Sequence, residues 1–224
     1  MKNIFPLLLA CAFFCASPLL ADDPAPVLNG WFAAQQKIQA WSADFIQTRS
    51  LKSLTQPLIG HGHVSFLMPD DFRWELGHPA QTIAIRHGDQ MYVVYPHLKR
   101  AELYPMGDNA PAQLRAALSL LQAGFPKSRD EFDAQYNILS LTQTNGNYAL
   151  TLQPKSPSAR QMMSQLQIGL SASDYSLTST ELTFADGSSL RNDFTNIVLN
   201  PSLDKTMFNW TPPADYNVVN PLGQ

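Results

Sequence analysis

The sequence predicts a mainly β protein with some α-helix: about eleven antiparallel strands, one helix before them and a helical insertion in mid-chain. Between residues 45 and 104, short apolar runs end at Pro, Gly or Asp, which are turn-forming residues. Within each run, large apolar side chains take alternate positions, as in strands with one apolar face. About eleven strands are enough to curl into a nearly closed barrel that helices plug or cover.

Residues 1–21 have the pattern of a secretory signal peptide. A lysine precedes the apolar stretch Ile4–Phe14, and Ala21 supplies a small residue for cleavage. Cleavage after about Ala21 predicts export to the periplasm, and residues 22–224 then form one domain of about two hundred residues. Both cysteines lie in the removed segment, so the mature chain has no disulfide and no thiol nucleophile. An alternative is a lipoprotein cleavage box at Leu8–Cys11, but the signal before it would be only about ten residues, which is shorter than usual.

The remaining elements follow from periodicity and from turn residues. A helix is predicted from Pro24 to about Gln39, because apolar residues recur at spacings of three and four and Pro24 suits a first helical turn. Asn145-Gly146 and Asp186-Gly187 mark hairpins. The predicted strands lie at about residues 42–50, 59–68, 72–77, 81–87, 90–95, 99–104, 136–143, 147–154, 163–171, 176–184 and 189–199.

The segment from residue 107 to 133 breaks the strand pattern. A helix is predicted over 112–123, with an apolar stripe and with Gly124 at its end. A second helix is predicted over 128–134, because Ser128 and Glu131 have the spacing of a capping box. A helical insertion with an apolar stripe between strands is placed as a lid would be.

Charge and motifs exclude several classes of protein. The formal net charge is −3 and no cluster of Lys and Arg occurs, which argues against nucleic acid and anionic membrane surfaces as partners. His61 and His63 would share a strand face, but no third ligand accompanies them, so no metal is expected. No Gly-x-Ser-x-Gly elbow and no phosphate-binding loop occur, so a hydrolase is the weakest alternative. No catalytic residue and no cofactor are predicted.

The alternation of apolar residues is the remaining candidate for function. Its simplest explanation is an ordinary core. The insertion and the six methionines after the signal favour a cavity for an apolar ligand, since flexible thioethers adapt to variable apolar partners.

Several segments, taken in order, resemble the LolA family, the periplasmic carriers that take lipoproteins from the inner to the outer membrane of Gram-negative bacteria. The segments are Trp41–Gln47, Gly60–Phe66, Pro69-x-x-Phe72-Arg73-Trp74, Pro79, Gly88–Tyr95, Asp186-Gly187 and Phe208-x-Trp210-x-Pro212-Pro213 continuing to Val218-Val219. The resemblance implies an unclosed β-barrel with a helical lid and an apolar cavity that shields acyl chains from water. It also implies an acylated lipoprotein or another lipid as cargo, an inner-membrane donor complex or lipid exporter, and an outer-membrane acceptor, with the carrier a monomer.

Strand parity then predicts which side chains line the cavity. The expected inward set is Val64, Phe66, Phe72, Trp74, Ile83, Ile85, Met91, Val93, Tyr95, Leu118, Leu121, Tyr148 and Leu150.

The sequence departs from the family pattern at Met68 and over the segment Leu98–Glu102, where the family often has Gln and Val. Lipoprotein carriers of this family have an Arg just before the proline of the Pro-x-x-Phe-x-Trp segment, where it ties the lid to the barrel, and here Met68 occupies that position. Arg73 is close in sequence, but its parity predicts the opposite face of the strand. These departures leave another acyl or polyene lipid open as the cargo. The main alternative to a carrier is an RseB-type regulatory module, which uses the same fold as a sensor.

Overall fold

The computed structural model describes residues 24–106, 124–126 and 128–221 of the 224-residue chain. The expected signal peptide, the expected helix over 112–123, and Leu118 and Leu121 of the expected cavity set lie outside the described residues.

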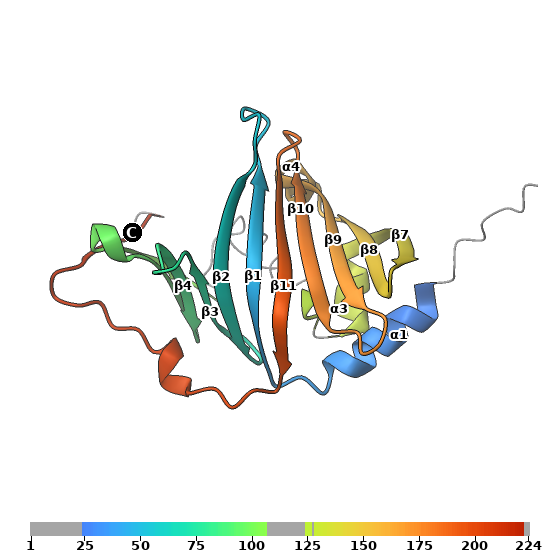
Figure 1. Ribbon diagram of the computed structural model, residues 1–224, viewed down its shortest axis with the longest axis horizontal. Helices are drawn as coiled ribbons and strands as arrows, with labels where there is room; N and C mark the ends of the chain where they lie inside the picture. The colour runs from blue at the N-terminus through green and yellow to red at the C-terminus, as the bar shows by residue number, and fades with distance from the viewer. Residues whose placement is uncertain (1–23, 107–123, 127, 222–224) are drawn as a thin grey trace, which may run out of the picture.

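The described strands form a single open sheet, as Figure 1 shows. The sheet runs in the order β12-β6-β5-β4-β3-β2-β1-β11-β10-β9-β8-β7. Its strands are β1 (Ala40–Ser50), β2 (Leu58–Leu67), β3 (Asp71–Leu76), β4 (Thr82–His87), β5 (Gln90–Tyr95), β6 (Arg100–Pro105), β7 (Tyr136–Thr144), β8 (Asn147–Pro154), β9 (Met163–Ser171), β10 (Leu177–Phe184), β11 (Ser189–Leu199) and β12 (Asn217–Val219). The predicted class, a mainly β fold built on an unclosed antiparallel sheet, is confirmed.

The sheet has one more strand than the sequence predicted. The short strand β12 pairs with β6 in parallel, whereas every other neighbouring pair is antiparallel. Three residues are too few to show a strand period, so only the pairing with β6 reveals this strand.

The described helical segments are short, and two of them follow their predicted signals. They are α1 (Pro24–Gln35), the 3₁₀ turn η1 (Pro96–Leu98), α3 (Arg129–Gln135), α4 (Pro157–Met162) and the 3₁₀ turn η4 (Lys205–Phe208). Helix α1 is described from Pro24, the first described residue, and it ends at Gln35, four residues before the predicted end, because turn-type bonds from Lys37 and Ile38 tighten the chain there. Helix α3 begins as predicted, with the Ser128 hydroxyl accepting a hydrogen bond from the Glu131 N–H at 3.1 Å.

The main core lies between the sheet and the helices α1 and α3. Trp31 and Phe32 of α1 pack on Phe132 of α3, with ring centroids 5.5 and 5.6 Å from that of Phe132. These rings belong to one cluster with fully buried residues of β8 and β9, among them Leu150 and Ile168. We call the face of the sheet that meets these helices the inner face. Figure 1 shows α3 behind β9 and β10 on that side.

After β11 the chain crosses the outer face of the sheet as a strap, residues 200–221, which ends at β12 (Figure 1). The Asp204 carboxylate caps η4 by accepting a hydrogen bond from the Thr206 N–H at 2.9 Å. The Arg73 guanidinium donates to the carbonyl of Met207 at 3.2 Å. Arg73 therefore lies on the outer face, as its parity predicted.

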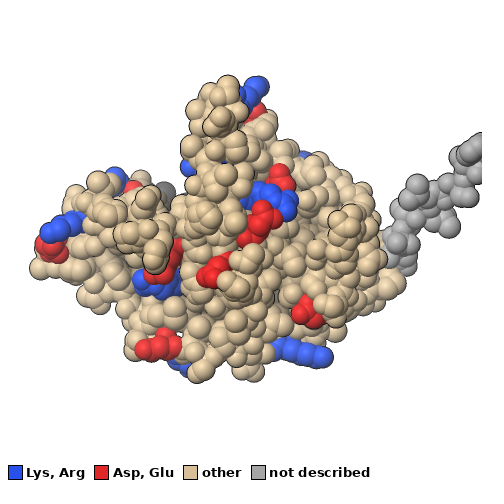
Figure 2. Space-filling view, in the orientation of Figure 1, with Lys and Arg blue, Asp and Glu red and all other residues tan. Residues whose placement is uncertain are grey.

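Charged side chains on the outer face are mixed in sign. Figure 2 shows them scattered, with one group of both signs over β10 and β11. In that region the Arg191 guanidinium donates to Asp193 at 2.6 Å and to Glu181 at 3.1 Å, and these two carboxylates raise its pKa. None of the described helices combines the length and the apolar character needed to cross a membrane.

Candidate functional site

The inner face of β2–β6 forms an apolar wall. Directly opposite residues on neighbouring strands point to the same face of a sheet, so the register decides which side chains share it. One row runs from Trp41 of the main core through Phe66 and Phe72, and it continues through Arg86 to Met91 and Tyr104. A second row runs from Ala43 through Val64, Trp74, Ala84 and Val93 to Glu102. We call the apolar members of these rows on β2–β6, together with Tyr95, the inner wall.

Seven of the predicted cavity residues belong to the inner wall: Val64, Phe66, Phe72, Trp74, Met91, Val93 and Tyr95. Val64, Phe72 and Met91 are buried, whereas the other four are half-buried. The wall thus keeps large apolar side chains in partial contact with solvent. Single exposed apolar residues are ordinary, whereas a group of them on one face is a feature that binding surfaces share.

Tyr148 and Leu150 of the predicted set also face inward, on β8, but they lie in the other half of the sheet. Leu150 is fully buried in the core with the helices, and Tyr148 stacks on Tyr175 with ring centroids 6.1 Å apart. This part of the inner face is filled by the protein itself.

Ile83 and Ile85 lie on the outer face, which corrects the predicted parity of strand β4. The turn at Gly88 and Asp89 joins β4 to β5 and pairs Arg86 with Met91 and Ile85 with Tyr92. Because paired residues share a face, an inward Met91 requires an inward Arg86 and an outward Ile85. The alternation of apolar residues predicted a strand here, but it could not predict which of the two sets of side chains points inward.

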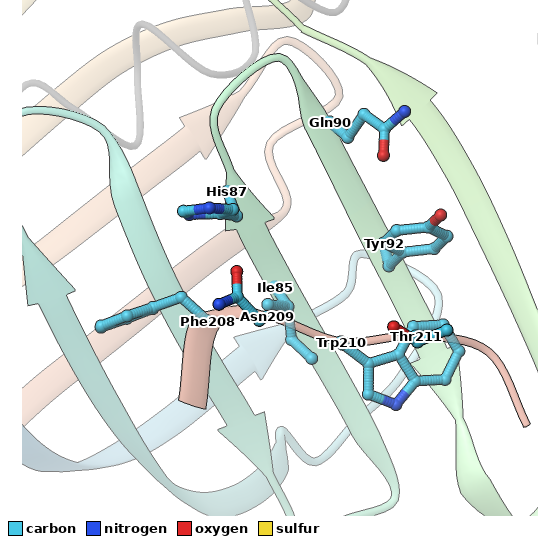
Figure 3. Close-up of a pocket in the computed structure, with 8 residues that line it drawn as sticks. All are labelled: Ile85, His87, Gln90, Tyr92, Phe208, Asn209, Trp210 and Thr211. Carbon is cyan, nitrogen blue, oxygen red and sulfur yellow. The ribbon is translucent and has the colours of Figure 1, made fainter. Parts of the chain in front are cut away.

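Ile85 is buried all the same, because the strap covers it. Phe208 of the strap is also buried, and the two residues line a small outer pocket of about 270 Å³ that Figure 3 shows. Tyr92 and Trp210 meet across this pocket, with ring centroids 5.0 Å apart. The full lining is Ile85, His87, Gln90, Tyr92, Phe208, Asn209, Trp210 and Thr211. The volume is below the usual range for organic ligands, so we interpret the pocket as a packing gap between the strap and the sheet. The residues around it form a second hydrophobic core on the outer face.

Sequence reasoning missed the polar residues of the inner face. Arg86 is 9% exposed and lies between Phe72 and Met91 in the first row. Towards β6, the Glu102 carboxylate accepts hydrogen bonds from the Tyr104 hydroxyl and the Arg100 guanidinium, both at 2.8 Å. Burial and the contact with Glu102 raise the pKa of Tyr104 to about 12, so its phenol stays neutral. The β4–β5 hairpin was the signal that could have found Arg86.

His63 makes a polar group on the outer face, opposite to the wall. Its Nδ1 contacts the Asp44 carboxylate at 2.7 Å, and its Nε2 lies 3.4 Å from Ser65 Oγ and 3.5 Å from Ser42 Oγ. The Asn196 amide donates to the same carboxylate at 2.8 Å, and this bond, followed by the one to His63, lowers the pKa of Asp44.

This outer group joins neighbouring strands of the sheet. Both serine contacts are long for hydrogen bonds of a hydroxyl, and the imidazole is nearly half exposed on a flat strand surface. The residues tie β1 to β2 and β11. Among the described residues, no group of three or more His, Cys, Asp and Glu is arranged to hold a metal ion.

The fold and the inner wall together define a class: half-open β-sheet proteins with helices on one part of the inner face and an apolar wall on the other. The family model described as outer membrane lipoprotein carrier protein LolA matches residues 36–211. The chain therefore belongs to the LolA family.

Individual relatives are distant but full-length. An outer-membrane lipoprotein carrier protein of Bordetella avium is 26% identical over 97% of this chain and 98% of the relative. Its counterpart from Chromohalobacter salexigens is also 26% identical, over 98% of this chain and 99% of the relative. A solved structure of an uncharacterized conserved protein from Thermus thermophilus covers 88% of this chain and 99% of its own, with a TM-score of 0.52 and 10% identity. That likeness concerns the fold alone.

Proposed function

We propose that this protein is a periplasmic carrier that holds the acyl chains of a lipoprotein or another lipid against the inner wall and moves them from the inner to the outer membrane. The observation that carries the proposal is the half-buried apolar wall of β2–β6 in a chain of the LolA family. Residues 1–21 would direct export, and the carrier would act as a monomer in one domain over residues 22–224.

The energetics of acyl chains support a carrier with such a wall. Each methylene exposed to water costs about 0.8 kcal/mol, so a lipoprotein anchor with dozens of methylenes does not cross an aqueous space unaided. An adaptable wall suits this task better than a tightly packed core, because the carrier must also release its cargo. The wall offers Met91, together with rings of Phe and Trp, for such contacts.

The partners follow from the direction of transport. A donor complex or a lipid exporter in the inner membrane would load the carrier, and an acceptor at the outer membrane would unload it. The mixed charges of the outer face and the net charge of −3 give no basis for a nucleic-acid partner.

The test is native mass spectrometry of the protein purified from its own periplasm, followed by lipid extraction of any bound species. A co-purifying lipoprotein supports the standard role, and a free acyl lipid supports a carrier with another cargo. The purified protein is then given a fluorescent fatty-acid probe. If it is empty and also takes up no probe, the carrier proposal fails and a regulatory module of the RseB type takes its place.

A further inference from the structure

Arg86 is the one residue that breaks the apolar character of the first row between Phe66 and Met91. Its side chain is only 10% exposed, and its direct neighbours across the strands are Phe72 and Met91. A guanidinium cannot lose its charge in a protein, so this position holds a permanent cation within an apolar surface.

The hydrogen-bonding capacity of Arg86 is not used up by the described residues. Its Nε is buried and has no hydrogen-bond partner among them. Its Nη1 forms an ion pair with the Asp70 carboxylate at 3.6 Å, a separation beyond hydrogen-bond distance. Buried polar groups are normally satisfied, and an unsatisfied one calls for an explanation.

The second arginine of the inner face differs in this respect. Arg100 donates to Glu102 at 2.8 Å, and its side chain is 45% exposed, so water can accept from its remaining donors. Among the two arginines on the described inner face, Arg86 is therefore the one with a buried donor that has no partner there.

Arg86 also lies at the end of its strand. Only His87 separates it from the turn at Gly88 and Asp89, and Asp70 belongs to the turn between β2 and β3. An amphiphile on the wall can thus keep its head at this end while its chains run over Trp74 and Val93 in the next row.

We propose that Arg86 binds an anionic oxygen of the cargo's head group, a carboxylate or a phosphate, while the inner wall holds the acyl chain. This inference rests on the proposed carrier function and narrows its cargo to acyl lipids with an acidic head. The planar guanidinium offers two parallel N–H groups to such an anion, and bonds of this kind are strong where water is excluded.

The test compares three fluorescent probes with the same long chain: a fatty acid, the corresponding primary alcohol and the corresponding alkyl phosphate. The unmodified protein should bind the acid and the phosphate about 10- to 100-fold more tightly than the alcohol, because a charge-assisted bond replaces a neutral one. In Arg86→Met this ratio should fall to about one, because the acid and the phosphate lose more affinity than the alcohol does. Arg86→Lys keeps the positive charge but cannot donate two parallel hydrogen bonds, so it should retain part of the preference for acidic head groups.

Arg73→Met is the matched control, since Arg73 occupies the opposite face of the neighbouring strand. It should leave the preference for acidic heads unchanged, and thermal unfolding checks that each variant is folded. A preference that persists in Arg86→Met, or that the unmodified protein lacks, overturns the assignment but leaves the carrier proposal standing. Inorganic phosphate that competes with the acid probe as well as the alkyl phosphate does would identify a free-anion site and overturn the lipid assignment. Failure to bind any of the probes overturns the assignment of Arg86, and it overturns the carrier proposal as well if the protein from its own periplasm is also empty.

Discussion

The two halves of the sheet differ in how their inner faces are covered. On β7–β11 the inner face is filled by α1 and α3, and side chains such as Leu150, Leu152 and Ile168 are fully buried. On β2–β6 the inner face carries half-buried rings, and the protein instead covers the outer face with the strap. One half of the sheet is thus packed against helices on its inner face, whereas the other half is packed against the strap on its outer face.

This difference explains how a sheet can keep an apolar face available without losing its strands. The outer core of Ile85, Phe208 and the Tyr92–Trp210 pair contributes buried apolar area that the inner wall does not supply by itself. The strap also pairs β12 with the edge strand β6, which shields hydrogen-bonding groups that would otherwise invite aggregation.

The largest expected effect comes from breaking the filled half. Trp31→Ala removes a fully buried ring that contacts Phe132 edge-on at 5.5 Å, and it should lower the free energy of unfolding by about 3–5 kcal/mol. Chemical denaturation measures the loss. Trp31→Phe should cost clearly less, because the indole N–H has no partner among the described residues and its removal leaves nothing unpaired. An equal loss in both variants would show that the filled half is not packed as described.

The next effect concerns the strap. Phe208→Ala should destabilise the protein by about 3 kcal/mol and should make residues 200–221 sensitive to protease, because the ring is buried against the outer face. Denaturation and limited proteolysis give the two readouts. Thr211→Ala, an exposed change in the same strap, should stay within about 0.5 kcal/mol. If uptake of an acyl probe fell in a still-folded Phe208→Ala protein, the separation of the two faces would be wrong.

A smaller effect separates the inner wall from the outer face directly. Val93→Asn and Ile83→Asn each place an amide at a half-buried position on neighbouring strands, so both should cost about 1 kcal/mol of stability. Only Val93→Asn should weaken acyl-probe binding, by about tenfold, because only Val93 faces inward. Probe titration at equal folded fraction decides between them, and equal loss of binding in both variants would refute the assignment of faces.

The sequence was sufficient for the class of fold and for eleven of the strands, and insufficient for the short elements β12 and α4 and for the inward face of β4. Turn residues and apolar alternation located the strands, and the Ser128 cap located α3, because these signals are local. The face of β4 depends on its pairing with β5 and on the strap, which lies more than a hundred residues away in the chain. Ile83 and Ile85 alternate as they would on an inner face, and nothing local reveals a second core behind the sheet.

The smallest expected effect is at the join of the two halves, where β1 pairs with both β2 and β11. Hydrogen bonds from Asn196 and His63 lower the pKa of Asp44 below its ordinary 3.8. A lowered carboxyl pKa contributes stability that is present above the ordinary value and is lost as the pH falls through the lower one.

Asp44→Asn should therefore cost less than about 1 kcal/mol at neutral pH, since the carboxylate is half exposed and solvent screens it. The gap between this variant and the unmodified protein should close as the pH falls below 3.8, and urea denaturation across that range measures it. Asn196→Ala removes the first of the two hydrogen-bond donors to Asp44. Much of the stability difference between the unmodified protein and Asp44→Asn should be lost with it. A gap that stays constant with pH would mean that the Asp44 charge does not tie the halves together.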